Sequence, residues 1–145
     1  SAVPDDGALA KESPLVDPRG AAQDSQGNLY ILSRRGHALR VVRPDGKVYT
    51  VAGTGEAHPG DGPALEAGLN GPKHLCIDLD DSVIIADAEN HLIKRYDPVS
   101  KTLSTILDHG PDGKPLNRPH GIWVRTDGTL YICDSWNDRI LKLTP

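Results

Sequence analysis

One sequence pattern occurs three times in this chain of 145 residues. Each copy opens on a proline, at Pro18, Pro72 and Pro119, and continues with two short apolar runs separated by a polar turn. A leucine precedes each proline by three residues, and a third apolar run follows in register. The prolines are 54 and then 47 residues apart, and a period of this size with several apolar runs predicts an array of stacked units. A single unit cannot bury both of its faces, so the units must pack against one another.

Each copy predicts a series of short antiparallel strands, because β-branched and aromatic residues fill the apolar runs and turn formers separate them. Glycine and asparagine in segments such as 25–28 and 126–129 suit tight turns between strands. The expected strands are 18–24, 75–79 and 122–125, then 29–33, 83–86 and 130–133, then 39–43, 92–96 and 139–143, and finally 48–52 and 103–107. The third copy lacks a fourth strand, so the chain is expected to be all-β, with eleven strands in three propeller blades.

The blades are expected to form one propeller domain with short connections. Ala10, Glu12 and Leu15 match Ala64, Glu66 and Leu69, so the chain is expected to begin inside a loop between blades. The expected boundaries are an N-terminal segment at 1–17, blade 1 at 18–55, a loop at 56–71, blade 2 at 72–110, a loop at 111–118 and an incomplete blade 3 at 119–145. One short piece, 63–67, could form a helical turn.

The combined pattern resembles the NHL repeat, a β-propeller blade family. The matching elements are Pro-x-x-apolar-x-apolar-Asp, Gly-Asn-Leu-Tyr-Ile and Asp-x-x-Asn-x-x-Ile, and together they cover about residues 7–145. The first copy departs from the pattern at Ser33 and Gly36, so its turn is expected to differ. The resemblance implies a ring of six blades.

Three blades make half of such a ring, and the two outermost sheets would expose apolar faces larger than a monomer usually tolerates. We expect two copies packed head to tail to close a six-bladed homodimer. A fragment of a longer propeller is the alternative, and self-association is expected in both cases.

Composition narrows the functional classes. The net charge is −4, and no run of Lys and Arg resembles a nucleic-acid footprint. No apolar stretch is long enough to span a membrane. Cys76 and Cys133 lie in different repeats without zinc-like spacing, so two free thiols are favoured over a disulfide. The compartment stays open, and a secreted or periplasmic one is compatible with the sequence.

Candidate site residues cluster where the first strand of each blade begins, which is the strand that lines a propeller's channel. His74 and His120 lie there, and Lys73 and Arg19 occupy the positions equivalent to His120. With Trp136, an aromatic residue on a turn that has no counterpart in the other copies, they form the expected ligand-binding residues at the channel mouth.

His120 and His74 are also candidate metal ligands, with zinc or calcium as the metal. The segment 119–122 is similar to the Pro-His motif of the peptidyl-amidating lyase, an NHL-like propeller with a zinc in its channel. In that lyase several blades supply histidines, whereas here Arg19 and Lys73 occupy the corresponding sites.

Three functional classes follow. The favoured one is a non-catalytic scaffold that binds a peptide, protein or small molecule, and the alternative is a metal-dependent lyase or hydrolase. The third, nucleic-acid binding, is implied by the resemblance to NHL domains, but the net negative charge and the lack of a basic patch disfavour it. Asp87 and Asp134, with Asn90 and Asn137, recur between blades and are interpreted as turn residues rather than catalytic acids.

Overall fold

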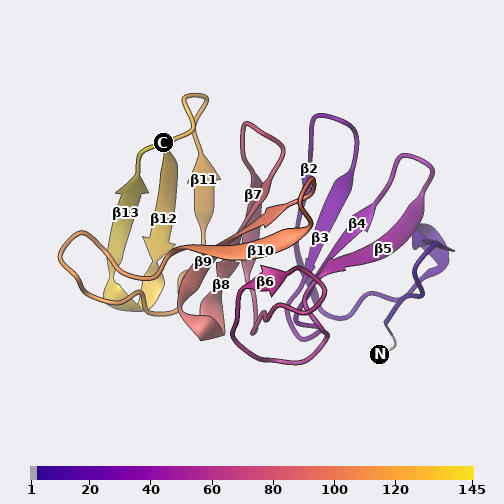
Figure 1. The fold of residues 1–145 in the computed structure, drawn as a ribbon, viewed down its shortest axis with the longest axis horizontal. Coiled ribbons are helices and arrows are strands. Elements are labelled where there is room, and N and C mark those ends of the chain that lie inside the picture. Colours follow the sequence, from indigo (N-terminus) through magenta and orange to yellow (C-terminus); the bar gives the residue numbers. More distant parts are fainter. Residues whose placement is uncertain (1–2) are drawn as a thin grey trace.

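The computed structural model describes residues 3–145 and contains three antiparallel sheets that stand side by side like a fan (Figure 1). Each sheet is a propeller blade. Blade 1 comprises β1 (Ala8–Leu9), β2 (Pro18–Gln23), β3 (Leu29–Ser33), β4 (Ala38–Val42) and β5 (Lys47–Ala52), in the spatial order β1-β5-β4-β3-β2. Blade 2 comprises β6 (Gly62–Pro63), β7 (His74–Ile77), β8 (Val83–Asp87), β9 (Leu92–Asp97) and β10 (Thr102–Leu107), in the order β6-β10-β9-β8-β7. Blade 3 comprises β11 (Ile122–Val124), β12 (Leu130–Asp134) and β13 (Arg139–Leu143).

The eleven expected strands are present, and two short strands, β1 and β6, were not expected. β1 lies in the segment 1–17 and pairs with β5, while β6 lies in the loop 56–71 and pairs with β10. Asp6 accepts a hydrogen bond from the Thr50 N–H at 2.8 Å, as Asp61 does from the Thr105 N–H at 2.7 Å. The N-terminal segment therefore repeats the structure of the loop between blades, as the sequence match predicted.

Three 3₁₀ turns were missed by sequence reasoning: η1 (Ala10–Glu12), η2 (Ala88–Asn90) and η3 (Ser135–Asn137). The segment 63–67 forms a hydrogen-bonded turn in which the Ala67 N–H donates to the Pro63 carbonyl. Among the described residues no helix is long and apolar enough to cross a membrane.

Asp87 and Asp134 organise the turns η2 and η3, which confirms their interpretation as structural residues. Asp87 accepts the Asn70 N–H at 2.7 Å and the Asn90 side chain at 2.8 Å. Asp134 accepts the equivalent bonds from Asn117 and Asn137, both at 2.8 Å.

Blade 1 builds the corresponding turn differently, as the departure at Ser33 predicted. The Ser33 hydroxyl donates to the Val16 carbonyl, where the other two blades have a carboxylate that accepts an N–H. In the first copy the side chain therefore donates a hydrogen bond to the preceding loop, whereas in the other two copies the side chain accepts one from that loop.

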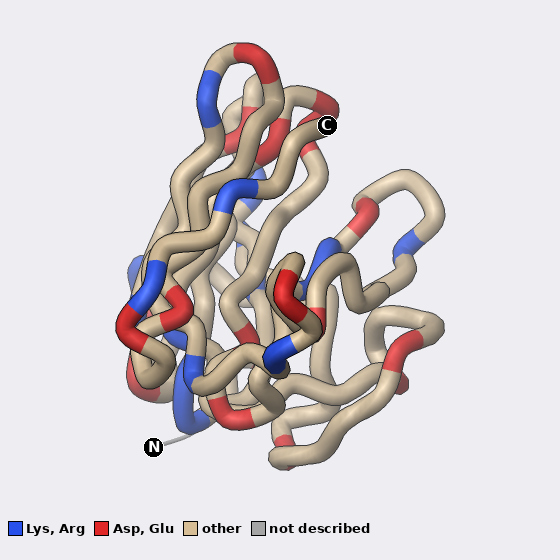
Figure 2. The backbone as a smooth tube through the Cα atoms, turned by 90° about the vertical axis from the view of Figure 1, so that its left-hand side faces the viewer, with Lys and Arg blue, Asp and Glu red and all other residues tan. Residues whose placement is uncertain are grey.

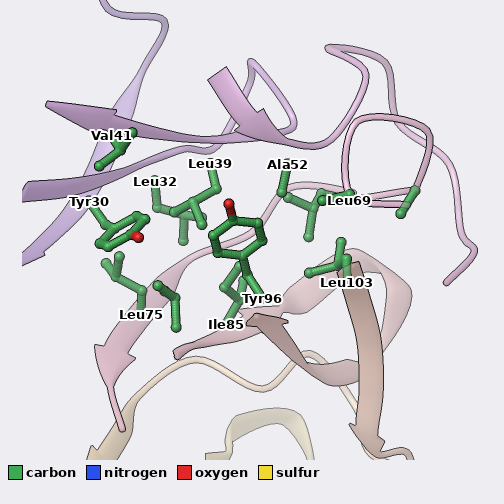
Figure 3. Packing of buried hydrophobic residues seen from close by; sticks show 13 residues of the cluster. Tyr30, Leu32, Leu39, Val41, Ala52, Leu69, Leu75, Ile85, Tyr96 and Leu103 are labelled. Carbon is green, nitrogen blue, oxygen red and sulfur yellow. The ribbon is translucent and has the colours of Figure 1, made fainter. Parts of the chain in front are cut away.

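The core consists of two apolar layers between adjacent blades. Between blades 1 and 2, Tyr30, Leu32 and Leu39 face Leu75, Ile85, Tyr96 and Leu103, and the rings of Tyr30 and Tyr96 lie 6.2 Å apart (Figure 3). Between blades 2 and 3, Ile84, Ala86 and Ile93 face Ile122, Ile132 and Leu141. Because each strand alternates between the two faces of its sheet, the middle blade contributes to both layers.

Two sheet faces have no neighbouring blade within residues 3–145. We call the side chains of blade 3 that point away from blade 2 its outer surface: Trp123, Tyr131, Cys133 and Ile140. Trp123 and Ile140 are 60% and 63% exposed, although their equivalents in blade 2, Cys76 and Ile93, pack in the core.

The outer surface of blade 1 consists of Ala21, Leu29, Ile31 and Val42, whose blade 2 equivalents Leu75, Val83, Ile85 and Tyr96 are buried against blade 1. Ala21 and Leu29 are exposed, and Ile31 and Val42 are half-buried. Both outer surfaces therefore carry apolar side chains at positions that, in blade 2, are packed against a neighbouring blade.

Each of the first two blades buries a cation at the same place. The Lys94 ammonium donates to the carbonyls of Gly60 and Gly68 at 3.0 and 2.8 Å and lies 3.7 Å from Asp87. Arg40, its counterpart in blade 1, is 1% exposed, and its Nε and Nη1 atoms have no hydrogen-bond partner among residues 3–145.

Candidate functional site

The first strands β2, β7 and β11 are neighbours, so their N-terminal ends come together on one edge of the fan (Figure 1). Arg19, Lys73 and His120 occupy equivalent positions there, and Arg118 lies two residues before His120. We call these four residues the basic cluster. Elsewhere basic and acidic residues are interspersed, and no broad field of one sign is visible from the side of blade 3 (Figure 2).

Arg118 links blades 2 and 3. Its guanidinium forms an ion pair with Glu89 of η2 and stacks on the ring of Trp136 in η3, 4.2 Å from the ring centroid. Trp136 remains 58% exposed beside the cluster. The predicted ligand-binding residue Trp136 is thus held next to a cation on a rigid turn.

The members of the basic cluster influence one another electrostatically. Desolvation lowers the pKa of Lys73, and the positive charges of Arg118, Arg34 and Arg19 lower it further. Desolvation likewise lowers the pKa of His120, with added repulsion from Lys73, Arg118 and Arg19. Glu89 opposes both shifts, but it is already paired with Arg118. Positive charge therefore exceeds negative charge at this edge.

Two polar features of the cluster lack a partner in the described chain. Within residues 3–145, neither Arg19 nor Lys73 forms an ion pair. Arg118 does form one, with Glu89. The Nε2 atom of His120 is buried and has no hydrogen-bond partner among the same residues. A buried polar atom without a partner costs free energy, which a ligand or water can recover.

His74 lies next to the cluster but has a structural contact of its own. Its Nδ1 accepts a hydrogen bond from the Ile122 N–H at 3.2 Å, which ties β7 to β11. Burial lowers its pKa, so the ring is neutral at pH 7 and carries its proton on Nε2. A metal bound to His74 would have to displace either that proton or that hydrogen bond.

Residues 3–145 offer no third ligand for the metal site predicted at His120 and His74. No group of three or more His, Cys, Asp or Glu side chains that could hold a metal occurs in the described part of the chain. Cys76 and Cys133 are free thiols, as expected, and burial raises the pKa of Cys76 to about 12.

A hydrogen bond between blades was not anticipated from the sequence. His37 of blade 1 accepts the Gly71 N–H at 3.0 Å, and His91 of blade 2 accepts the Arg118 N–H at 3.0 Å. Both histidines have left-handed backbone conformations, with φ of 46° and 59°. Their equivalent in blade 3 is Asp138, with φ of 52°. The aligned positions 37, 91 and 138 were the available signal, because all three can carry a hydrogen-bond acceptor.

We expect this contact to make stability depend on pH. Desolvation, followed by the charge of Arg34, lowers the pKa of His37 from 6.5. A histidine with a lowered folded-state pKa contributes full stability above its unfolded pKa and loses it as the pH falls below that value. Asparagine tolerates left-handed backbone and its amide oxygen can still accept the Gly71 N–H. Between pH 7.5 and 5, the free energy of unfolding should therefore fall more for the wild type than for His37→Asn, as measured by urea denaturation. Parallel pH profiles would rule this contribution out.

Sequence reasoning identified three of the four members of the basic cluster and missed Arg118. It also missed Glu89 and Arg34. None of these three recurs at the same position in the other repeats, where their counterparts are unlike residues. The position of Arg118 immediately before Pro119, at the start of a blade, was the one available signal.

Comparisons with known proteins agree with this fold. No family model matches the chain. It is 31% identical to NHL repeat-containing protein 2 from Bos taurus over 90% of its own length and 20% of that protein. The chain thus spans about a fifth of this curated relative.

Solved structures superimpose on this chain at lower sequence identity. An auxiliary nutrient binding protein from Bacteroides ovatus superimposes with a TM-score of 0.72 at 21% identity, over 86% of this chain and 36% of that one. A gluconolactonase from Xanthomonas campestris superimposes with a TM-score of 0.60 at 18% identity, over 79% of this chain and 34% of that one.

The three fanned antiparallel sheets and these superpositions define the class as β-propeller. Within this class, the threefold motif and the matched relatives place the chain in the NHL-repeat family.

Proposed function

We propose that this chain is a non-catalytic binding scaffold, with its ligand held at the basic cluster. The observation that carries the proposal is the charge of the exposed Arg19 in β2 and of the half-buried Lys73 just before β7, neither of which has an anionic partner in the described chain. Side chains on a rigid scaffold suit ligand contact because little conformational entropy is lost on binding. The structural likeness to a nutrient binding protein is consistent with this role.

We also propose that the scaffold functions as a closed ring formed by two copies. In this arrangement the outer surface of blade 3 packs on the outer surface of blade 1 of a second copy. The large side chains Trp123 and Ile140 would meet a surface that includes the small Ala21 and the half-buried Ile31. Large and small residues at facing positions allow a blade interface to fill without voids.

Hydrogen-bonding groups on the two outer surfaces support the same packing. Asp138 occupies the position from which His37 and His91 accept an N–H of the next blade. The N–H that would reach it belongs to Asp17, the equivalent of Gly71 and Arg118, and all three have left-handed backbone with φ between 45° and 53°. A second copy would therefore continue the hydrogen-bond pattern found between the blades of one chain.

A metal-dependent lyase or hydrolase is the second candidate function. The observations that favour it are the two neutral channel histidines, His74 and His120, and the likeness to a gluconolactonase. A ring of two copies would contain four such histidines, two from each chain.

Metal analysis separates the two candidates. We expect protein purified without chelator, then dialysed against micromolar zinc or calcium, to retain less than one tenth of an equivalent of metal per ring. The scaffold proposal would fail if one equivalent of zinc or calcium were retained per ring and lost in the His120→Ala variant. The Lys47→Met variant, altered at an exposed site in blade 1, is the control for non-specific uptake.

A further inference from the structure

The ligand of the basic cluster is inferred here to be a small molecule that carries an oxyanion, either a carboxylate or a phosphate. This inference rests on the proposed binding function and adds the chemical class of its ligand. Three observations support it: the excess positive charge, the charged N–H donors at the cluster, and the exposed ring of Trp136 beside them.

The excess positive charge is confined to one edge of the molecule. The chain as a whole has a net charge of −4, yet Arg19, Lys73 and Arg118 converge on one edge with Glu89 as the nearby acid. Glu89 is occupied by Arg118, so the charges of Arg19 and Lys73 are not neutralised by a paired acid in the described chain. Placing like charges together is unfavourable unless a counter-charge binds, and after desolvation by burial the charges of Arg118, Arg34 and Arg19 lower the pKa of Lys73 further.

The donors at the cluster match an oxyanion. Lysine and arginine supply charged N–H donors, and charge-assisted bonds from such groups to carboxylate or phosphate are stronger than neutral ones.

The same edge also has a surface for the rest of a ligand. Trp136 is 58% exposed, and its ring lies under the Arg118 guanidinium. An exposed aromatic ring beside a cation can contact the apolar part of a small molecule. The arrangement therefore fits an organic acid or phosphate ester better than a neutral or cationic ligand.

The inference is tested by isothermal titration of the intact chain with inorganic phosphate and, separately, with citrate. We expect saturable binding of at least one anion, weakened at least tenfold by Lys73→Met and reduced by added sodium chloride. Lys47→Met removes the same charge from an exposed strand end and should bind like the wild type. Phosphate binding without citrate binding would assign a phosphate ligand, and the reverse would assign a carboxylate.

The inference is overturned if neither anion binds, or if Lys73→Met and Lys47→Met weaken binding equally. Binding of choline but not of either anion would also contradict it. If the anions fail to bind while metal analysis still shows a metal-free ring, the ligand class is wrong and the scaffold proposal stands. If a stoichiometric metal is found, the scaffold proposal itself fails.

Discussion

Replacing Lys94 by methionine is expected to lower the free energy of unfolding by about 3–5 kcal/mol, since breaking a buried ion pair leaves an uncompensated charge. Asp87 and Lys94 are both fully buried, and the ammonium also satisfies the carbonyls of Gly60 and Gly68. Methionine fills a similar volume but supplies no donor. Urea denaturation of the Lys94→Met variant at pH 8 measures the loss.

Arg40 provides the matched control in blade 1. Its guanidinium is buried at the equivalent position, but Nε and Nη1 lack partners within residues 3–145, and Ser33 replaces the aspartate. Arg40→Met should therefore change the free energy of unfolding by no more than about 1 kcal/mol, because a cation with incomplete compensation contributes little net stability. Equal losses in the two variants would show that the Asp87 ion pair is not the source of the stability.

The cost of Lys94→Met should also depend on pH. Burial raises the pKa of Asp87 to about 6 even with Lys94 present, and removing the cation raises it further. At pH 5 the carboxyl group of the variant is then protonated, so no uncompensated charge remains. The difference from the wild type should shrink between pH 8 and pH 5.

The second large effect is expected on self-association. Trp123→Asp places a charge on the outer surface of blade 3, where burial of an unpaired carboxylate against a second copy would be strongly unfavourable. This variant should weaken dimerisation by at least a hundredfold while keeping the fold of one chain, since Trp123 does not pack in either core layer. Sedimentation equilibrium measures the dissociation constant.

Two further variants make this result specific. Val99→Asp adds the same charge at a residue that is 91% exposed in the turn between β9 and β10, and should leave association unchanged. Asp138→Ala removes the expected acceptor for the Asp17 N–H and should weaken association about fivefold to tenfold, whereas Asp138→Asn keeps an acceptor and should lose less. Equal weakening by Trp123→Asp and Val99→Asp would refute the proposed interface.

The strands could be predicted from the sequence because their signals are local and repeated. Continuous short apolar runs that follow turn-forming residues define β3, β8 and β12 in all three copies. The two-residue strands β1 and β6 could not be found in this way, because Gly62–Pro63 has no strand propensity. They exist because the loop between blades runs beside the last strand of each sheet.

The site was only partly predictable for a related reason. Arg19, Lys73 and His120 stand in register, so the alignment of the repeats brings them together. Arg118 joins them because its side chain lies between Glu89 and Trp136, and that placement depends on how blade 3 packs on blade 2. Contacts between blades are tertiary, and no spacing within one repeat reports them.

We propose that the outer surfaces of blades 1 and 3 each need a partner blade. The mass of the particle in solution tests this proposal most directly. Multi-angle light scattering at micromolar concentration should give twice the chain mass of 15.6 kDa. A stable particle of single-chain mass across this concentration range, folded by circular dichroism, would contradict the account.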